Sequence, residues 1–247
     1  MSTKPQIGIR YCGGCNSRYD RVALAKRLMA VLPEYDFVGT EEGGTYAAVV
    51  ILHGCLSRCT KTDDLNVADS QIVGMNGFED LLPTKKRLIE LVECQRMLQE
   101  KDYLKFSKEE LKEILPHREP MLFVDQVTAL VPGFQAEAKL FIDSAWDLFK
   151  GHFPDAPVFP GALITEAIAQ TADLMMLTKE LYKGKTPLFM GIDRASFRRK
   201  VEPGMEVTIK TSVAQEDEER GIVICKGQMF LPTGEMAATT QISLAFR

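Results

Sequence analysis

The chain has 247 residues, of which 45% are hydrophobic and 26% charged, and its net charge is −4. This composition is typical of soluble globular proteins and excludes disordered and fibrous classes. The even charge balance argues against a nucleic-acid or anionic-membrane partner that binds the whole surface. The N-terminus has no apolar signal region and the longest aliphatic stretch, residues 47–52, is too short to span a bilayer, so we expect a cytoplasmic protein.

The first hundred residues follow a β-α-β pattern, which predicts a small α/β domain. Hydrophobic periodicity predicts strands at 7–11, 35–38 and 47–52, and helices at 16–32 and 84–101. The third strand is a continuous apolar run, as in parallel strands that are covered on both faces. Cys94 falls on the apolar face of the second helix, so we expect it in the core.

A domain boundary is expected near residue 104. Ser107 and Glu110 form a capping box that opens a short helix, and Pro116 ends it. We therefore expect a small α/β cysteine domain over residues 1–104 and a second domain over residues 105–247. Five of the six cysteines lie in the first domain, so the two domains should have different roles.

The second domain has the pattern of an antiparallel sheet around one long helix. Polar and apolar residues alternate over 135–142 and 207–213, and extended runs at 221–231 and 236–246 are joined by a turn at 232–234. The predicted helix covers residues 162–182, where 13 of 21 residues are apolar and lie nearly all round. Such a helix is buried, so the expected fold class is α+β.

The residues just before and inside this helix can provide acid–base chemistry. Three prolines between residues 151 and 161 hold His152 on a stiff loop, and Glu166 lies one turn inside the helix. The helical neighbours of Glu166 are mostly small and apolar, so we expect a desolvated, protonated acid there and a neutral base at His152. The free N–H of Gly161 can stabilise an oxyanion. The alternative is an ordinary hydrogen-bonded histidine and a solvent-facing glutamate.

The order of short motifs along the second domain is similar to that of one enzyme family. These motifs are residues 114–125, 151–154, 159–161, 166–170, 191–199 and 203–204. Over about residues 107–247 the chain resembles the 3-hydroxyacyl-[acyl-carrier-protein] dehydratases of type II fatty acid synthesis. The resemblance implies a hotdog fold and a cofactor-independent dehydration by a His152/Glu166 dyad. Glutamate at the acid position, where the sister dehydratase-isomerases carry aspartate, favours the plain dehydratase; Lys200, where proline is more common, departs from the pattern.

The spacing of the dyad bears on the oligomeric state. His152 and Glu166 are 14 positions apart, which would be about 21 Å as continuous helix, too far for one substrate. Either the loop folds back or a second subunit supplies one partner. The resemblance implies the second option, a homodimer with sites at its interface, and a trimer of dimers is the larger assembly that we consider.

Three further features complete the expected site. His117 is a rival base, but in the resembling family this histidine is structural. The resemblance implies an acidic carrier protein as the partner that delivers the substrate, and a basic cluster suits it. This cluster consists of Arg194, Arg198, Arg199 and Lys200. The alternative for the cluster is a solvated strand edge.

Four cysteines of the first domain follow two predicted parallel strands, at strand ends that share one sheet edge. Cys12 and Cys15 follow the first strand, and Cys55 and Cys59 follow the third, near His53. Such a set can bind zinc or an iron–sulfur cluster, form a redox disulfide, or remain inert in the core. The segment resembles small bacterial domains named for a CGGC motif.

Other functions remain open at this point. Hotdog domains host several thioester reactions, so a coenzyme A thioester hydratase or a thioesterase is an alternative. A redox- or metal-sensing acyl-binding module with a vestigial dyad is an alternative from a different class.

Overall fold

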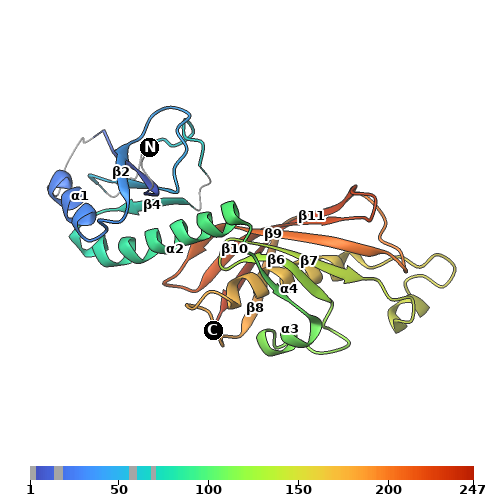
Figure 1. Cartoon of the computed structure of the whole chain (residues 1–247). Coiled ribbons are helices and arrows are strands. Elements are labelled where there is room, and N and C mark those ends of the chain that lie inside the picture. Colours follow the sequence, from blue (N-terminus) through green and yellow to red (C-terminus); the bar gives the residue numbers. More distant parts are fainter. Residues whose placement is uncertain (1–3, 14–18, 56–59, 68–70) are drawn as a thin grey trace. The chain divides into compact units, whose positions relative to one another are not determined.

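The computed structural model describes residues 4–13, 19–55, 60–67 and 71–247 (Figure 1). The chain divides into two compact units, Met1–Glu100 and Lys101–Arg247, close to the boundary proposed from the sequence. We describe each unit by itself. Among the described residues no helix combines the length and apolarity needed to cross a bilayer.

The first unit is a parallel sheet with the strand order β2-β1-β3-β4. The strands are β1 (Gln6–Tyr11), β2 (Asp36–Gly39), β3 (Ala48–Leu52) and β4 (Ile72–Met75). The helices are α1 (Arg21–Ala30) and α2 (Leu81–Glu100), with the short 3-10 helix η2 (Phe78–Asp80) before α2. The predicted β-α-β pattern is confirmed, and β4 is an additional strand that the sequence analysis missed.

Local chemistry explains where α1 begins. The Asp20 carboxylate accepts a hydrogen bond from the Ala23 N–H, so it caps the helix and Arg21 is the first helical residue. The prediction placed this start at residue 16, and residues 16–18 lie outside the described residues. Cys94 is half-buried on α2, so its placement in the core was wrong.

The second unit is an antiparallel sheet with the strand order β5-β6-β7-β9-β10-β11-β8. The strands are β5 (Leu104–Phe106), β6 (Gln126–Val131), β7 (Gln135–Phe141), β8 (Pro187–Phe197), β9 (Glu206–Asp217), β10 (Ile222–Phe230) and β11 (Met236–Phe246). The helices are α3 (Lys108–Ile114), the 3-10 helix η3 (Asp147–Lys150) and α4 (Gly161–Leu177).

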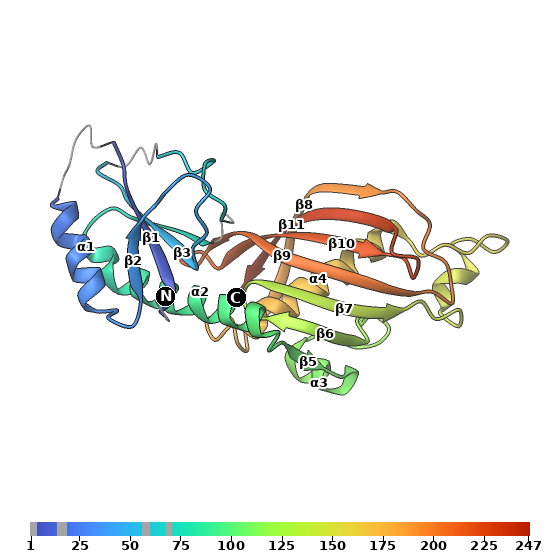
Figure 2. The same ribbon diagram turned by 45° about the horizontal axis from the view of Figure 1, so that its top comes forward.

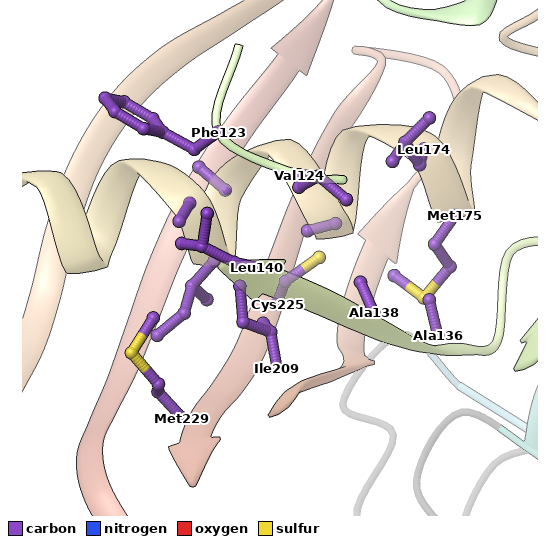
Figure 3. Close-up of a cluster of buried hydrophobic side chains, with 14 of the residues drawn as sticks. Phe123, Val124, Ala136, Ala138, Leu140, Leu174, Met175, Ile209, Cys225 and Met229 are labelled. Carbon is purple, nitrogen blue, oxygen red and sulfur yellow. The ribbon is translucent and has the colours of Figure 1, made fainter. Parts of the chain in front are cut away.

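Helix α4 lies along the curved sheet (Figure 2). Most of its residues are buried. Its contact with β10 is close at Gly227, where an added Cβ would lie 2.1 Å from a methyl carbon of Ile168. Apolar side chains from the sheet fill the space beside α4, among them Leu140, Ile209 and Cys225 (Figure 3). Burying one aliphatic side chain of this size contributes about 1.5–3 kcal/mol. The sheet wrapped around one long helix is the expected hotdog fold.

Most predicted element boundaries of the second unit agree with the structure, but helix α4 is shorter than predicted and three strands were not predicted. The capping box at Ser107 and the turn at Gly234, with φ of +84°, are confirmed. Helix α4 ends at Leu177 instead of residue 182, because the chain continues there in turns: the Lys179 N–H donates to Met176 and the Tyr182 N–H to Lys179, each three residues back. Strands β5, β6 and β8 were missed; the residues of β8 are exposed on both faces and show no alternation.

Candidate active site

His152 is held so that one ring nitrogen remains available. Its Nδ1 lies 2.8 Å from the Val158 carbonyl oxygen. Because a carbonyl can only accept a hydrogen bond, Nδ1 carries the proton and a neutral ring keeps its lone pair on Nε2. Two backbone bonds fix the loop, from the His152 N–H to Leu148 and from the Val158 N–H to His152. The arrangement suits a general base.

His152 faces an open hollow of about 350 Å³ at the start of α4. The hollow is lined by His152, Val158, Phe159, Gly161, Ile164, Phe197, Arg198, Arg199, Lys200 and Val201. Pro160 precedes the helix without a side-chain cap, and no described residue accepts the Gly161 N–H. An added Cβ at Gly161 would lie 3.1 Å from the Phe197 ring. The hollow thus brings the predicted base and the predicted oxyanion donor to one place.

Glu166 lies in a second, hydrogen-bonded cluster. Its Oε1 accepts from the Gln170 Nε2 at 2.8 Å and lies 3.4 Å from the His117 Nε2. Gln170 also donates to the Met121 carbonyl and accepts from the Phe123 N–H. The prediction that Glu166 faces a mostly apolar surface was therefore wrong. Helical spacing shows only the neighbours within one helix, whereas the segment from residue 117 to 123 folds over this turn.

His117 is part of this cluster although the sequence analysis gave it only a structural role. Burial lowers the pKa of His117, and the neighbouring Glu166 opposes that shift. A neutral His117 can still hydrogen-bond to the Glu166 carboxyl, 3.4 Å away. Gln170 was missed as a candidate, although its position four residues after Glu166 on the same helix face could have indicated it.

Within one chain the two members of the proposed dyad belong to different clusters. No hydrogen bond or ion pair among the described residues joins His152 to Glu166. His152 contacts the loop before α4, whereas Glu166 contacts the segment after α3. Both alternatives from the spacing of the dyad therefore remain: either the loop folds back, or a second subunit supplies one partner.

The four basic residues divide between two hollows. Arg198, Arg199 and Lys200 line the His152 hollow, and Arg199 also pairs with Glu235 at 3.4 Å. Arg194 lines another hollow of about 440 Å³ on the sheet, together with Lys210 and Lys226. The structure thus brings three of the four predicted carrier-binding residues together beside His152.

Cys12 follows β1 at the carboxyl edge of the first unit's sheet. Its Sγ accepts hydrogen bonds from the Gly54 N–H at 2.9 Å and from the Arg21 guanidinium at 3.2 Å. Cys55 is half-buried, while Cys15 and Cys59 lie outside the described residues. Within the described ranges no group of three His, Cys, Asp or Glu side chains can hold a metal. A guanidinium on the Cys12 sulfur also disfavours a second cation there, so the described residues do not fit a metal ion.

Comparisons with known proteins place the second unit in a family. The FabA-like domain family matches residues 115–240, just over half of the chain, and a family described only as uncharacterized matches residues 6–96. The 3-hydroxyacyl-[acyl-carrier-protein] dehydratase FabZ of Staphylococcus carnosus is 36% identical over 142 residues, which are 58% of this chain and 96% of the relative. FabZ of Ligilactobacillus salivarius is 49% identical over 105 residues, covering 41% of this chain and 75% of the relative.

Solved structures with a similar chain course include a thioesterase from Haemophilus influenzae, which is 16% identical with a TM-score of 0.41 and covers 57% of this chain and 91% of that one. The family match and the curated relatives carry the assignment. The chain belongs to the FabA-like domain family and, by its relatives, to the FabZ-type hotdog dehydratases within it.

Proposed function

We propose that the second unit dehydrates 3-hydroxyacyl chains, carried as thioesters on acyl carrier protein, to trans-2-enoyl chains in fatty acid biosynthesis. The observation that carries this proposal is the hollow in which the free Nε2 of His152 and the free N–H of Gly161 share one opening. The names of the relatives supply the substrate class. We also propose that the protein acts in the cytoplasm.

The proposed elimination takes one proton from C2 and delivers one proton to the hydroxyl on C3, while the C2–C3 bond becomes a double bond. His152 Nε2 takes the proton from C2, and the Gly161 N–H stabilises the negative charge that develops on the thioester oxygen. The electron pair forms the C2–C3 double bond and expels the hydroxyl, which Glu166 protonates to water. Gln170 holds Oε1 of Glu166, which leaves Oε2 to carry the proton. The reaction transfers no net electrons, so its chemistry requires no redox cofactor.

We further propose that a second copy of the chain completes the site. β8 is an edge strand of the sheet and carries several large apolar side chains on its exposed surface. Leu188, Phe189, Met190, Ile192 and Phe197 are between 43% and 55% exposed. An exposed apolar edge strand is a template for pairing, and a two-fold dimer lets the same strand pair with itself. Such pairing would bring His152 of one subunit toward Glu166 of the other.

A mixed dimer tests both the dyad and its sharing between subunits. His152→Ala and Glu166→Gln chains with different affinity tags are co-expressed, and the heterodimer is isolated through both tags. If the dyad crosses the interface, one of two sites is intact and the heterodimer shows about half of the wild-type turnover, whereas each mutant homodimer is inactive. An inactive, folded heterodimer would contradict the shared site.

The identity of the product separates this proposal from its alternatives. Purified protein is mixed with a 3-hydroxyacyl carrier-protein thioester, and the conjugated enoyl product and free thiol are followed together. Enoyl product without thiol release supports the dehydratase. Thiol release without enoyl product indicates a thioesterase, and binding without turnover indicates an acyl-binding sensor.

We propose that Arg198, Arg199 and Lys200 receive the acidic carrier protein. They line the hollow that His152 faces, so a carrier bound there can place its thioester against the base. Opposite charges on two surfaces accelerate encounter and fix their orientation. Arg194, which lines the other hollow, stays a weaker candidate for the same contact.

For the first unit the four-cysteine site remains a proposal with two forms. Cys12, Cys15, Cys55 and Cys59 would either bind one zinc or iron–sulfur group or provide a Cys12–Cys15 redox pair. The Arg21 contact with Cys12 favours the redox form. Stoichiometric zinc or iron in anaerobically purified protein, lost on Cys55→Ser, would support metal. Absence of metal with a disulfide that cycles on mild reduction would support the redox pair.

A further inference from the structure

A hollow of about 440 Å³ on the outer face of the second unit's sheet has no role in the proposed mechanism. We call it the sheet hollow. Its long side chains are the exposed ones of β9 and β10, which alternate with buried residues that face α4. Among the described residues it shares none with the hollow at His152. Its lining consists of Gln135, Arg194, Lys210, Thr211, Ser212, Lys226, Gly227, Gln228, Thr239, Thr240 and Gln241.

The sheet hollow is positively charged, although the chain as a whole has a net charge of −4. Three of the described residues that line it are cations, namely Arg194, Lys210 and Lys226, and none of them is an acid. A neighbouring hollow of about 590 Å³ on the same sheet is lined by two lysines and two glutamates, so its charges balance. Positive charge is therefore concentrated in the sheet hollow.

Two of its three cations have no protein partner. Lys210 forms an ion pair of 3.0 Å with a glutamate of β7, and Lys139 on the same face forms one of 3.7 Å with a glutamate of β9. In the described part of the chain no hydrogen bond or ion pair engages the side chain of Arg194 or Lys226. Two unpaired cations on one hollow repel each other, and an anion between them would replace this repulsion with attraction.

The backbone register aligns these two cations with an amide between them. Lys226 of β10 lies opposite Gln241 of β11, and Gln241 lies opposite Arg194 of β8. Neighbouring strands are about 4.8 Å apart, so the two cationic residues are about 10 Å apart across the sheet, and their long side chains can reach one group above Gln241. The Gln241 amide lies 3.5 Å from the Asp193 carboxylate, at the limit of a hydrogen bond, so it can turn to a ligand.

These donors match a phosphate group. A guanidinium can donate two parallel hydrogen bonds to phosphate, and an ammonium and an amide can donate to its remaining oxygens. The volume lies within the range of about 300–1,000 Å³ that is typical of small-molecule sites, which leaves room for more than the phosphate itself. We propose that the sheet hollow binds a phosphorylated small molecule, whose phosphate is held by Arg194, Gln241 and Lys226. This inference does not depend on the dehydratase function.

Binding of inorganic triphosphate, ATP and adenosine to the full-length protein tests the proposal. Titration calorimetry at low ionic strength, where screening is weak, should show saturable binding of triphosphate and ATP but not of adenosine. Arg194→Gln combined with Lys226→Gln should weaken binding of both phosphate probes by about tenfold or more, because charge-assisted hydrogen bonds are lost. Lys139→Gln is the matched control, a lysine of the same sheet face outside the hollow, and should change the affinity by less than about twofold.

A chemical measurement on the wild-type protein locates the bound probe, and it decides the question even if a variant fails to fold. Triphosphate should protect Lys226 from acetylation by an amine-reactive reagent and leave Lys139 reactive, as measured by mass spectrometry after digestion. Equal affinities for triphosphate and ATP would identify phosphate as the whole recognised group, and tighter binding of ATP would identify a nucleotide as the ligand.

Three results would overturn the proposal. They are the absence of saturable triphosphate and ATP binding, binding of adenosine as tight as that of ATP, and equal losses of affinity in the folded double variant and the folded Lys139→Gln control. Equal protection of Lys226 and Lys139 would likewise show that triphosphate associates with the sheet surface without a site.

Discussion

The two units place their reactive residues differently relative to their sheets. In the first unit Cys12, His53 and Cys55 follow strands at the carboxyl edge of a parallel sheet, where unrelated α/β proteins bind ligands. In the second unit His152 and Glu166 belong to α4 and the loop before it. The antiparallel sheet provides none of the proposed reacting groups and instead buries the helix. Changes at one site should therefore leave the other site intact.

The largest expected effect is on the dyad. His152→Ala and Glu166→Gln should each lower kcat by about 100-fold or more, because each removes a positioned base or acid. Steady-state rates of enoyl formation measure this. His117→Asn is the matched control, since it changes the Glu166 cluster without removing the acid. Its kcat should fall by less than about tenfold. Full activity in the folded His152→Ala variant would contradict the proposed mechanism.

A smaller loss is expected at the start of α4. Gly161→Ala should lower kcat by about tenfold, because its Cβ would lie 3.1 Å from the Phe197 ring and displace the N–H that faces the hollow. Binding of an unreactive acyl carrier should change little. A loss confined to KM would mean that Gly161 only shapes the hollow.

Charge reversal beside the hollow should affect recognition of the carrier. Arg198→Glu with Lys200→Glu should raise KM for the carrier-bound substrate by about tenfold and leave the same acyl group on a small thiol unaffected. Arg194 lines the other hollow and is the weaker candidate for this contact, so Arg194→Glu should raise KM for the carrier-bound substrate less than the double variant does. Equal effects on both substrates would show that these residues contact the acyl group instead.

A stability effect with a defined pH dependence is expected at Asp173. Burial raises its pKa in the folded state, so between the unfolded pKa of about 3.9 and the folded pKa the native protein binds more protons. The free energy of unfolding must then fall as the pH rises through this window. Asp173→Asn should therefore unfold at higher denaturant concentration than the wild type at pH 7, and this gain should shrink toward pH 4. A stability gain of Asp173→Asn that does not depend on pH would contradict a raised pKa for the buried Asp173 carboxyl.

The smallest expected effect tests the independence of the two units. A fragment from Asp102 onward should dimerise and dehydrate with kcat/KM within about twofold of the full chain, because the proposed dyad lies beyond residue 150. Cys12→Ser in the full chain should likewise leave kcat/KM for dehydration within about twofold of the wild-type value. An inactive but folded dimeric fragment would show that the first unit takes part in the chemistry.

The sequence predicted best those elements whose periodicity reflects burial. β9, β10 and β11 have one buried face and alternate clearly, and α4 is apolar all round because the sheet encloses it. β8 has no buried face within one chain, so no pattern marked it. The motif order identified His152 and Gly161 together, and both line one hollow.

Hydrophobic periodicity did not predict the contacts between segments that are far apart in the sequence. The cluster around Glu166 joins α4 to His117 and to backbone groups about fifty residues earlier, and the spacing of residues on one helix contains no information about them. The same limit applies to Asp173, whose neighbour Cys225 comes from a strand 52 positions later.

The close approach at Gly227 limits how the substrate preference of this enzyme can be altered. With Ile168 lying where a Cβ would be, any larger residue at position 227 must lift α4 away from β10. The helix therefore has a fixed height above the sheet, and both His152 and Glu166 depend on that height for their placement. Variants selected for other substrates should therefore keep Gly227, and libraries that randomise this position should return mostly unfolded clones.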